Sequence, residues 1–262
     1  MPRSLSIEPS LGAHERRDHL LSTLAREQRI LSLRIARDLG VSDDTIRRDL
    51  EQLEREGLLR RVHGGALPIS PALGSYSERS ERDAPLKRRL GEAGARLVQR
   101  DMTVMLYGGT TILQVARSLA AQTPFTLVTN DPQVALEVGR SPRRVECILI
   151  GGRFSPRHAL TLGAVAVEAI QSMRFDLVLL GTCAIDATFG IASADPEDAH
   201  LQRAAIASSA RAIALVTPEK LGTCAPFRIA PVAALEKIVT ATEAPAATTA
   251  SLREAGVSIE LV

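Results

Sequence analysis

The stretch Leu39 to Ala66, LGVSDDTIRRDLEQLEREGLLRRVHGGA, constrains the fold more than any other part of the chain. Gly40 fits a turn, and the Ser42 hydroxyl is placed to accept an unpaired amide hydrogen of the helix that follows. Gly57 can end that helix because glycine tolerates the left-handed backbone conformation. One buried stripe is predicted from three apolar residues at helical spacing: Ile46, Leu50 and Leu53.

The opposite face of this helix is polar. Asp44, Arg48 and Arg55 lie opposite the apolar stripe. Thr45 and Arg47 flank it. Arginine can bridge guanine O6 and N7 or grip a phosphate, and threonine can reach a base edge or a thymine methyl group. The pattern therefore predicts a face that enters a DNA major groove, with an ordinary solvated helix as the alternative.

Residues 58–63, LLRRVH, predict a short strand that closes on Gly64 and Gly65. This strand would form a wing whose arginines lie against backbone phosphates. Together the helix and the wing predict the following DNA-binding residues: Ser42, Asp44, Thr45, Arg47, Arg48, Arg60, Arg61 and His63.

Net charge gives little support to this interpretation. Residues 1–66 contain 12 Arg and 11 Asp or Glu, so the segment is barely basic and lacks the electrostatic footprint common in DNA-binding domains. The prediction rests on the residue pattern.

Bulk composition bounds the remaining possibilities. A chain of 262 residues with 45% apolar residues has enough material for one large or two modest globular domains. The sequence contains no apolar run long enough for a membrane span or a secretory signal, so we expect a cytoplasmic protein. Cysteines and histidines lack metal-ligand spacing, and we expect neither a metal nor another cofactor.

Two helices are predicted before the central stretch. Residues 14–28 carry leucines at helical spacing, and Ser32 is placed to cap a second helix over residues 33–39. The predicted order is helix, helix, turn, helix, wing, over residues 14–66. Residues 67–84 are rich in Pro, Ser and charge and predict a linker.

From residue 85 to 262, helical patterns alternate with short apolar runs. This alternation predicts an open parallel sheet with crossover helices, which is an α/β domain. The predicted strands are residues 104–106, 125–128, 145–150, 176–181, 212–216 and 237–240.

Polar or glycine-rich segments follow five of these strands. The first strand runs into YGGTT, residues 107–111, and then into a helix from about Ile112, which would present amides and hydroxyls to a phosphate. The carboxyl ends of parallel strands line one crevice, so the five segments together predict a ligand pocket. Each segment also has a simpler interpretation as a tight turn or a helix cap. Neither GxGxxG nor GxxxxGK[ST] occurs.

VSDDTIRRDLEQLEREGLLRRVHGGA resembles, almost residue for residue, the signature of the DeoR family of bacterial transcriptional regulators. The resemblance extends from about His14 to the end of the chain. It implies a second domain similar to ribose-5-phosphate isomerase that senses a phosphorylated sugar. Transferred position by position, the family pattern implies these effector-binding residues: Gly109, Thr110, Thr111, Thr129, Asn130, Gly151, Gly152, Asp186 and Lys220. The YGGTT segment itself adds Gly108 to the predicted effector-binding residues.

The sequence departs from the family pattern at several charged positions. Tyr107 and Thr217 stand where the family commonly has aspartate, and Asp198 and Gln202 stand where a Glu-x-x-x-Lys motif is expected. The DNA-binding signature is intact while the sensor signature is altered. We therefore expect an effector that is unusual, weakly bound or absent.

The main hypothesis is a homo-oligomeric repressor of a carbohydrate-metabolism operon that binds double-stranded operator DNA and responds to a small phosphorylated effector. In this hypothesis the chain has no catalytic residues and no membrane contact. One alternative is a sugar-phosphate isomerase with an accessory DNA-binding domain, for which Asp186 or Asp198 would be the general base. Another is a constitutive DNA-binding protein whose α/β domain only mediates assembly.

Overall fold

The structure is a computed structural model that describes residues 11–119, 124–140 and 145–262. The chain forms two compact units. The first comprises Met1–Ile69 with Gly222–Cys224, and the second comprises Ser70–Leu221 with Ala225–Val262. Each unit is described separately below.

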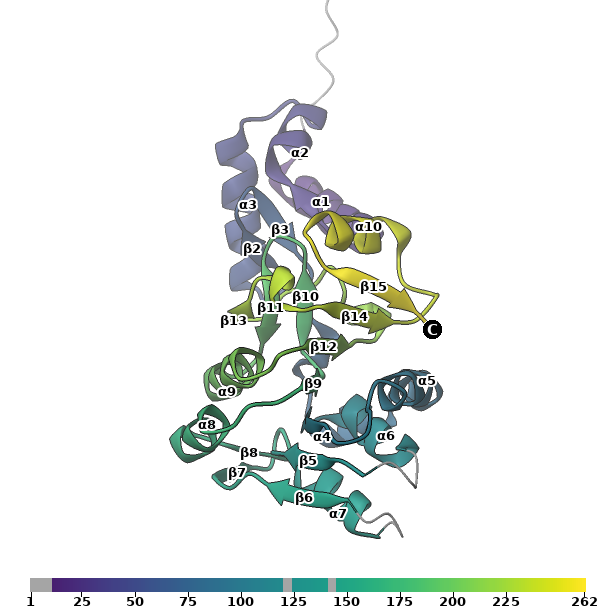
Figure 1. Cartoon of the computed structure of the whole chain (residues 1–262). Helices are drawn as coiled ribbons and strands as arrows, with labels where there is room; N and C mark the ends of the chain where they lie inside the picture. Colours follow the sequence, from purple (N-terminus) through teal and green to yellow (C-terminus); the bar gives the residue numbers. More distant parts are fainter. Residues whose placement is uncertain (1–10, 120–123, 141–144) are drawn as a thin grey trace, which may run out of the picture. The chain divides into compact units, whose positions relative to one another are not determined.

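The first unit is a winged helix-turn-helix, and its predicted element order is confirmed (Figure 1). The side chains of its three helices enclose one small core around Leu20, Ile46 and Leu50. A strand that the sequence did not predict, β1, pairs with β3, so the sheet order is β1-β3-β2. The elements are α1 (Ala13–Glu27), β1 (Ile30–Leu31), α2 (Ser32–Asp38), α3 (Asp43–Arg55), β2 (Arg60–Val62) and β3 (Gly65–Leu67).

The predicted cap of α2 by Ser32 is wrong. Leu31 is the N-cap residue and makes no side-chain cap bond, and Ser32 is the first helical residue. The reason is strand β1, which ends at Leu31 and continues directly into the helix. The amide of Ser32 donates to the carbonyl of Gly64 at 2.9 Å, so the backbone of the wing satisfies the donor at this point.

The second unit contains a seven-stranded sheet in which every neighbouring pair is parallel. The six predicted strands are present. The additional edge strand, β15, was missed because SIEL lacks a continuous apolar run. In spatial order the strands are β15 (Ser258–Leu261), β14 (Lys237–Thr240), β12 (Ala212–Leu215), β9 (Leu177–Leu180), β4 (Thr103–Tyr107), β5 (Thr126–Thr129) and β6 (Glu146–Leu149).

Helices cover both faces of this sheet, which explains why its central strands read as continuous apolar runs. Alternate residues of β4 show the division: Met105 and Tyr107 belong to one core cluster, and Val104 and Leu106 to the other. The first cluster includes residues of α8 (Ala164–Gln171), α9 (Pro196–Ala207) and α10 (Ala246–Glu254). The second includes residues of α5 (Ala84–Ala95), α6 (Thr110–Ser118) and α7 (Pro132–Arg140).

The strand order reverses between β4 and β9. From β4 the chain proceeds outward to β5 and β6, then returns to the other side of β4 and proceeds through β9, β12, β14 and β15. Connections that leave two adjacent strands in opposite directions open a crevice at their carboxyl ends, where ligands of open α/β sheets bind. The topology therefore places a candidate site beside Tyr107 and Leu180, the last residues of β4 and β9.

Smaller elements surround this point. An antiparallel hairpin joins β7 (Arg153–Ser155) to β8 (Leu160–Leu162), and a second small sheet has the order β10-β11-β13. Its strands are β10 (Ala184–Asp186), β11 (Gly190–Ser193) and β13 (Phe227–Ala230). The remaining elements are the 3-10 helices η1 (Pro71–Leu73), η2 (Pro218–Lys220) and η3 (Val232–Ala234).

The segment for which the sequence predicts a linker, residues 67–84, contains regular structure. It includes η1 and the helix α4 (Tyr76–Glu81). A capping box starts α4: Ser75 accepts from the amide of Glu78, and the Glu78 carboxylate accepts from the amide of Ser75. The spacing S-x-x-E was a sequence signal for this helix. The division of the chain into domains at these residues stays a prediction.

Candidate functional site

Helix α3 has the predicted cap, buried face and end. Ser42 Oγ accepts from the amide of Thr45 at 3.1 Å. Ile46, Leu50 and Leu53 are each at most 2% exposed. The helix ends at Arg55, and Gly57 adopts a φ of +73° two residues later. The cap and the buried stripe fix which side of α3 faces solvent.

The solvent side of α3 carries the two arginines expected to contact DNA. The side chains of Arg47 and Arg48 are 68% and 79% exposed. Each pairs with an aspartate one turn earlier, Arg47 with Asp43 at 3.0 Å and Arg48 with Asp44 at 2.7 Å. Exposed pairs of this kind contribute about 0 to 1 kcal/mol, so DNA phosphates or bases can displace the aspartates.

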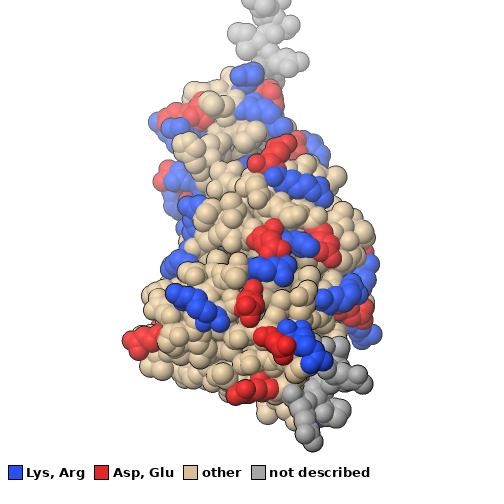
Figure 2. Space-filling model, viewed as in Figure 1, with Lys and Arg blue, Asp and Glu red and all other residues tan. Residues whose placement is uncertain are grey.

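The wing is attached to α3 by a residue that the sequence analysis did not single out. Glu54 accepts from the amide of Arg61 at 3.0 Å and from its guanidinium at 3.1 Å, and lies 3.7 Å from the guanidinium of Arg60. Arg60 and Arg61 remain exposed, and so does His63 in the turn between β2 and β3. Figure 2 shows basic and acidic side chains interspersed on the face in view, in line with the nearly balanced composition.

A cavity of about 40 Å³ opens at the carboxyl ends of β4, β9 and β12, in the second unit. Residues from α4, α9 and the β7–β8 hairpin complete its wall. The lining residues are Arg79, Tyr107, Gly108, Gly109, Thr110, Thr111, His158, Leu160, Gly181, Thr182, Cys183, Asp198, Gln202 and Lys220.

Five of the ten predicted effector residues line this cavity: Gly108, Gly109, Thr110, Thr111 and Lys220. Thr129 and Asn130 lie behind it. Thr129 Oγ1 donates to the carbonyl of Leu106 at 2.8 Å, and Asn130 Oδ1 accepts from the amide of Gly108 at 3.2 Å. These two residues therefore hold the loop that follows β4.

The other three predicted effector residues, Gly151, Gly152 and Asp186, are not among the lining residues. A Cβ on Gly152, whose φ is +139°, would lie 2.6 Å from the carbonyl oxygen of Leu162, so close backbone approach explains this glycine. Asp186 Oδ1 accepts from the amides of Thr188 and Phe189 at 2.9 and 2.8 Å and supports the turn between β10 and β11.

The amino terminus of α6 forms one wall of the cavity. The helix begins at Thr110, two residues before the predicted start, with Gly109 as its N-cap at a φ of +128°. Asp131 Oδ2 accepts from the amide of Gly109 at 3.1 Å, and burial raises the pKa of Asp131. The Gly108 and Gly109 amides are thus already bonded, which leaves the amides of Thr110 and Thr111 as the helix-terminal donors for an anion.

Two flexible cations lie in the cavity wall. Arg79, on α4, has a buried Nε without a hydrogen-bond partner among the described residues. Lys220 ends η2, and burial lowers the pKa of Lys220 to about 8. A buried guanidinium donor without a partner is costly, and an anion in the cavity would satisfy it. Sequence analysis missed Arg79 because it lies in the predicted linker.

Lys87 holds the segment that carries Arg79. This lysine, on α5, is 3% exposed and donates to the carbonyl oxygens of Arg79 and Arg82, at the end of α4. Burial lowers the pKa of Lys87. Its ammonium group satisfies carbonyls that α4 leaves unpaired and so fixes the position of Arg79 beside the cavity.

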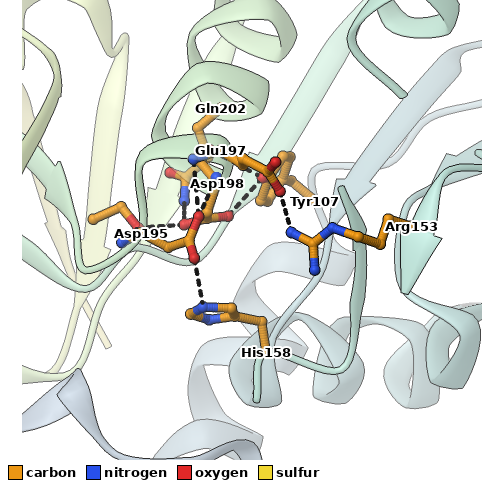
Figure 3. A network of polar contacts seen from close by, with 8 residues as sticks. Tyr107, Arg153, His158, Asp195, Glu197, Asp198 and Gln202 are labelled. Atoms are coloured by element: carbon orange, nitrogen blue, oxygen red, sulfur yellow. Dashed lines mark hydrogen bonds and ion pairs between the residues drawn. The ribbon is translucent and has the colours of Figure 1, made fainter. Parts of the chain in front are cut away.

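Three of the four altered family positions, Tyr107, Asp198 and Gln202, form one connected network at the cavity (Figure 3). Asp198 Oδ1 accepts from the Tyr107 hydroxyl at 2.7 Å, and Asp198 Oδ2 accepts from Gln202 Nε2 at 3.0 Å and from the Ser193 hydroxyl. Burial and the neighbouring Asp198 raise the pKa of Tyr107 well above its ordinary value, so the phenol remains a donor. Two contacts flank the network: His158 Nε2 lies 3.5 Å from Asp195 Oδ2, and Arg153 forms an ion pair with Glu197.

Within residues 11–119, 124–140 and 145–262, no group of three or more His, Cys, Asp or Glu side chains is placed to hold a metal ion. Likewise, none of the helices found there has the length and apolar character needed to cross a bilayer.

A winged helix-turn-helix joined to an α/β unit with a cationic cavity defines a ligand-responsive DNA-binding regulator. The family model for the DeoR C terminal sensor domain matches residues 82–242, and that for the DeoR-like helix-turn-helix domain matches residues 16–72. The chain belongs to the DeoR family of transcriptional regulators.

Curated relatives agree with this assignment. The putative aga operon transcriptional repressor of Escherichia coli O157:H7 is 29% identical over 96% of this chain and 94% of its own length. The HTH-type transcriptional repressor GlcR of Bacillus subtilis is 30% identical over 86% of this chain and 87% of its own length.

A solved structure of ribose 5-phosphate isomerase A from Methanocaldococcus jannaschii matches with a TM-score of 0.39 and 11% identity, over 53% of this chain and 54% of that chain. A likeness this loose carries no argument, so the resemblance of the second domain to that isomerase stays a prediction.

Proposed function

We propose that this regulator represses a carbohydrate-metabolism operon and leaves its operator when a phosphorylated sugar or a related metabolite binds in the cavity. The observation that carries the proposal is the Nε of Arg79, which is unpartnered within residues 11–119, 124–140 and 145–262. Arg79 lines the cavity together with Lys220 and the amino terminus of α6. All three attract a phosphate. The name of one relative, the putative aga operon transcriptional repressor, states for that protein that it represses an operon.

The proposal assigns DNA binding to residues 14–66 and effector sensing to residues 85–262, in the cytosol where the operator lies. The test is fluorescence anisotropy of the full chain on DNA from its flanking operon. We expect tight binding to one site and release by a phosphorylated sugar. Operator binding that no phosphorylated metabolite weakens would contradict the sensing role and favour a constitutive DNA-binding protein.

We propose that the chain is not an enzyme. An isomerase needs a carboxylate free to take a proton from its substrate. Asp198 already accepts from Tyr107, Ser193 and Gln202, and Asp186 supports a turn away from the cavity lining. An aldose–ketose isomerisation assay on the full chain should show no turnover, and measurable turnover lost on Asp198→Asn would refute this part of the proposal.

The proposed regulator acts as a homo-oligomer held mainly through the α/β domain. One winged helix reads only a few bases, so operator affinity requires repeated half-sites and paired copies. Edge strand β6 exposes Ile148 and Leu149, an arrangement that favours pairing with a second copy. Analytical ultracentrifugation should show an oligomer on operator DNA, and a monomer bound there would contradict the proposal.

Effector binding should weaken above pH 8. The ammonium form of Lys220 binds a phosphate, and its pKa in the free protein is about 8. Binding is therefore strongest below pH 8 and declines as the proton is lost, while below pH 6 the phosphate monoester itself gains a proton. If the bound anion raises the Lys220 pKa to 10 or more, the Kd rises about eightfold from pH 7.5 to 9.

The matched variant for this measurement is Lys220→Met. The charged or titratable groups that influence Lys220 are Cys183, Arg79, Glu219 and Lys87. Because all four remain in the variant, a flat pH profile there assigns the effect to Lys220. Calorimetric titration of both proteins across this range provides the comparison, and parallel profiles would exclude Lys220 as the titrating group.

A further inference from the structure

The inner wall of the cavity is formed by Tyr107, Asp198 and Gln202. Tyr107 is 1% exposed, and its hydroxyl is bonded to Asp198. The Asp198 carboxylate accepts from three side-chain donors. The phenol and the carboxylate therefore satisfy each other within the protein.

Gln202 differs from Tyr107 and Asp198 because its hydrogen bonding within the cavity wall is incomplete. Its Nε2 donates to Asp198, and the residue is 3% exposed. Its buried Oε1 has no hydrogen-bond partner within the part of the chain that the structure describes. A buried amide oxygen without a donor is costly. Because Gln202 lines the cavity, a hydroxyl group of a bound molecule can supply the missing donor.

Space in the cavity is limited. Its volume of about 40 Å³ holds on the order of three water molecules. A phosphate group at the amino terminus of α6 takes up most of that volume. The buried ring of Tyr107, at the end of β4, belongs to the wall of the same cavity and bounds the space that remains. Only a short carbon chain can then lie between the phosphate and Gln202.

We infer that the cavity selects a short phosphorylated polyol, of about three or four carbons, over hexose phosphates. Its phosphate lies among Arg79, Lys220 and the α6 amino terminus, and one of its hydroxyl groups donates to Gln202 Oε1. Tyr107 is the residue that sets the size limit. This inference rests on the proposed function, because it concerns the effector of the same cavity.

Calorimetric titration of the full chain with inorganic phosphate, glycerol phosphate and glucose 6-phosphate tests the inference. We expect glycerol phosphate to bind at least about tenfold more tightly than either of the others, since it alone both fits and supplies the hydroxyl donor. Glucose 6-phosphate binding as tightly as glycerol phosphate would overturn the size limit and leave the proposed sensor function intact. Failure of all three to bind would overturn the inference, whereas the proposed sensor function is tested separately by operator release with other phosphorylated metabolites.

Variants separate the size limit set by Tyr107 from the hydroxyl contact made by Gln202. Tyr107→Ala should raise the affinity for glucose 6-phosphate about tenfold, whereas Tyr107→Phe, which keeps the ring, should retain the wild-type selectivity. Gln202→Met should weaken glycerol phosphate about tenfold and leave inorganic phosphate unchanged. Equal weakening of both ligands by Gln202→Met would refute the hydroxyl contact. If Tyr107→Ala does not fold, Gln202→Met and the comparison of the three ligands on the wild type still test the inference.

Discussion

Replacing Arg79 by alanine is expected to lower the affinity of the full chain for a phosphorylated effector by about tenfold to a hundredfold or more. The physical reason is the loss of a charge-assisted hydrogen bond, worth about 1.5 to 3 kcal/mol, from a partly buried guanidinium whose Nε has no other partner among the residues that the structure describes. The backbone carbonyl of residue 79 still accepts from Lys87, so the segment should keep its place. Calorimetric titration with the effector measures the change.

Arg88→Ala is the matched control for Arg79→Ala. Arg88 is an exposed arginine on α5 outside the cavity lining, and its removal changes net charge by the same amount. The control should bind effector as the wild type does, and both variants should retain operator affinity. An Arg79→Ala variant that still binds effector with wild-type affinity would exclude Arg79 from the site.

Replacing Arg48 by alanine is expected to cost about 1 to 3 kcal/mol in binding to the specific operator and less on random DNA, if its guanidinium contacts a base. Its side chain is 79% exposed on the outer face of α3 and pairs with the exposed Asp44 at 2.7 Å. Removal of the arginine also leaves the Asp44 carboxylate near the DNA without its partner. Fluorescence anisotropy on operator and random duplexes measures both losses.

Arg55→Ala is the control for this measurement. Arg55 lies on the last turn of α3, is 65% exposed and pairs with Glu51 at 3.4 Å. It lies farther from the amino-terminal end of the helix, which is the end that contacts bases in helix-turn-helix proteins. We expect a small change for Arg55→Ala. Equal losses on operator and random DNA for Arg48→Ala would instead make Arg48 a phosphate contact.

Local signals predicted the DNA-binding helix well. Its cap, its buried face and its end each depend on residues within one or two turns, such as Ser42 with the amide of Thr45. The predicted cap of α2 was wrong because a long-range pairing, β1 with β3, determines where that helix starts. The six central strands were identifiable as apolar runs, whereas edge strand β15 was not.

The cavity was only partly predictable. The glycine and threonine residues after β4 and the lysine after β12 follow from the topology of parallel strands. Arg79 comes from the segment for which a linker was predicted, and His158 from a hairpin turn. Neither residue follows a strand of the main sheet, so the rule that located the other lining residues did not apply to them.

The altered positions Tyr107, Asp198 and Gln202 were visible in the sequence, but their mutual bonding was not. The sequence by itself determined the winged helix-turn-helix pattern, the α/β class and the presence of an anion-attracting loop, because these depend on periodicity and short-range hydrogen bonds. Only the tertiary structure decided that Arg79 and Lys220 line the same cavity. It also decided that the Tyr107 hydroxyl donates to Asp198, 91 positions later in the chain. Such contacts depend on strand order, and the local pattern of residues carries no information about strand order.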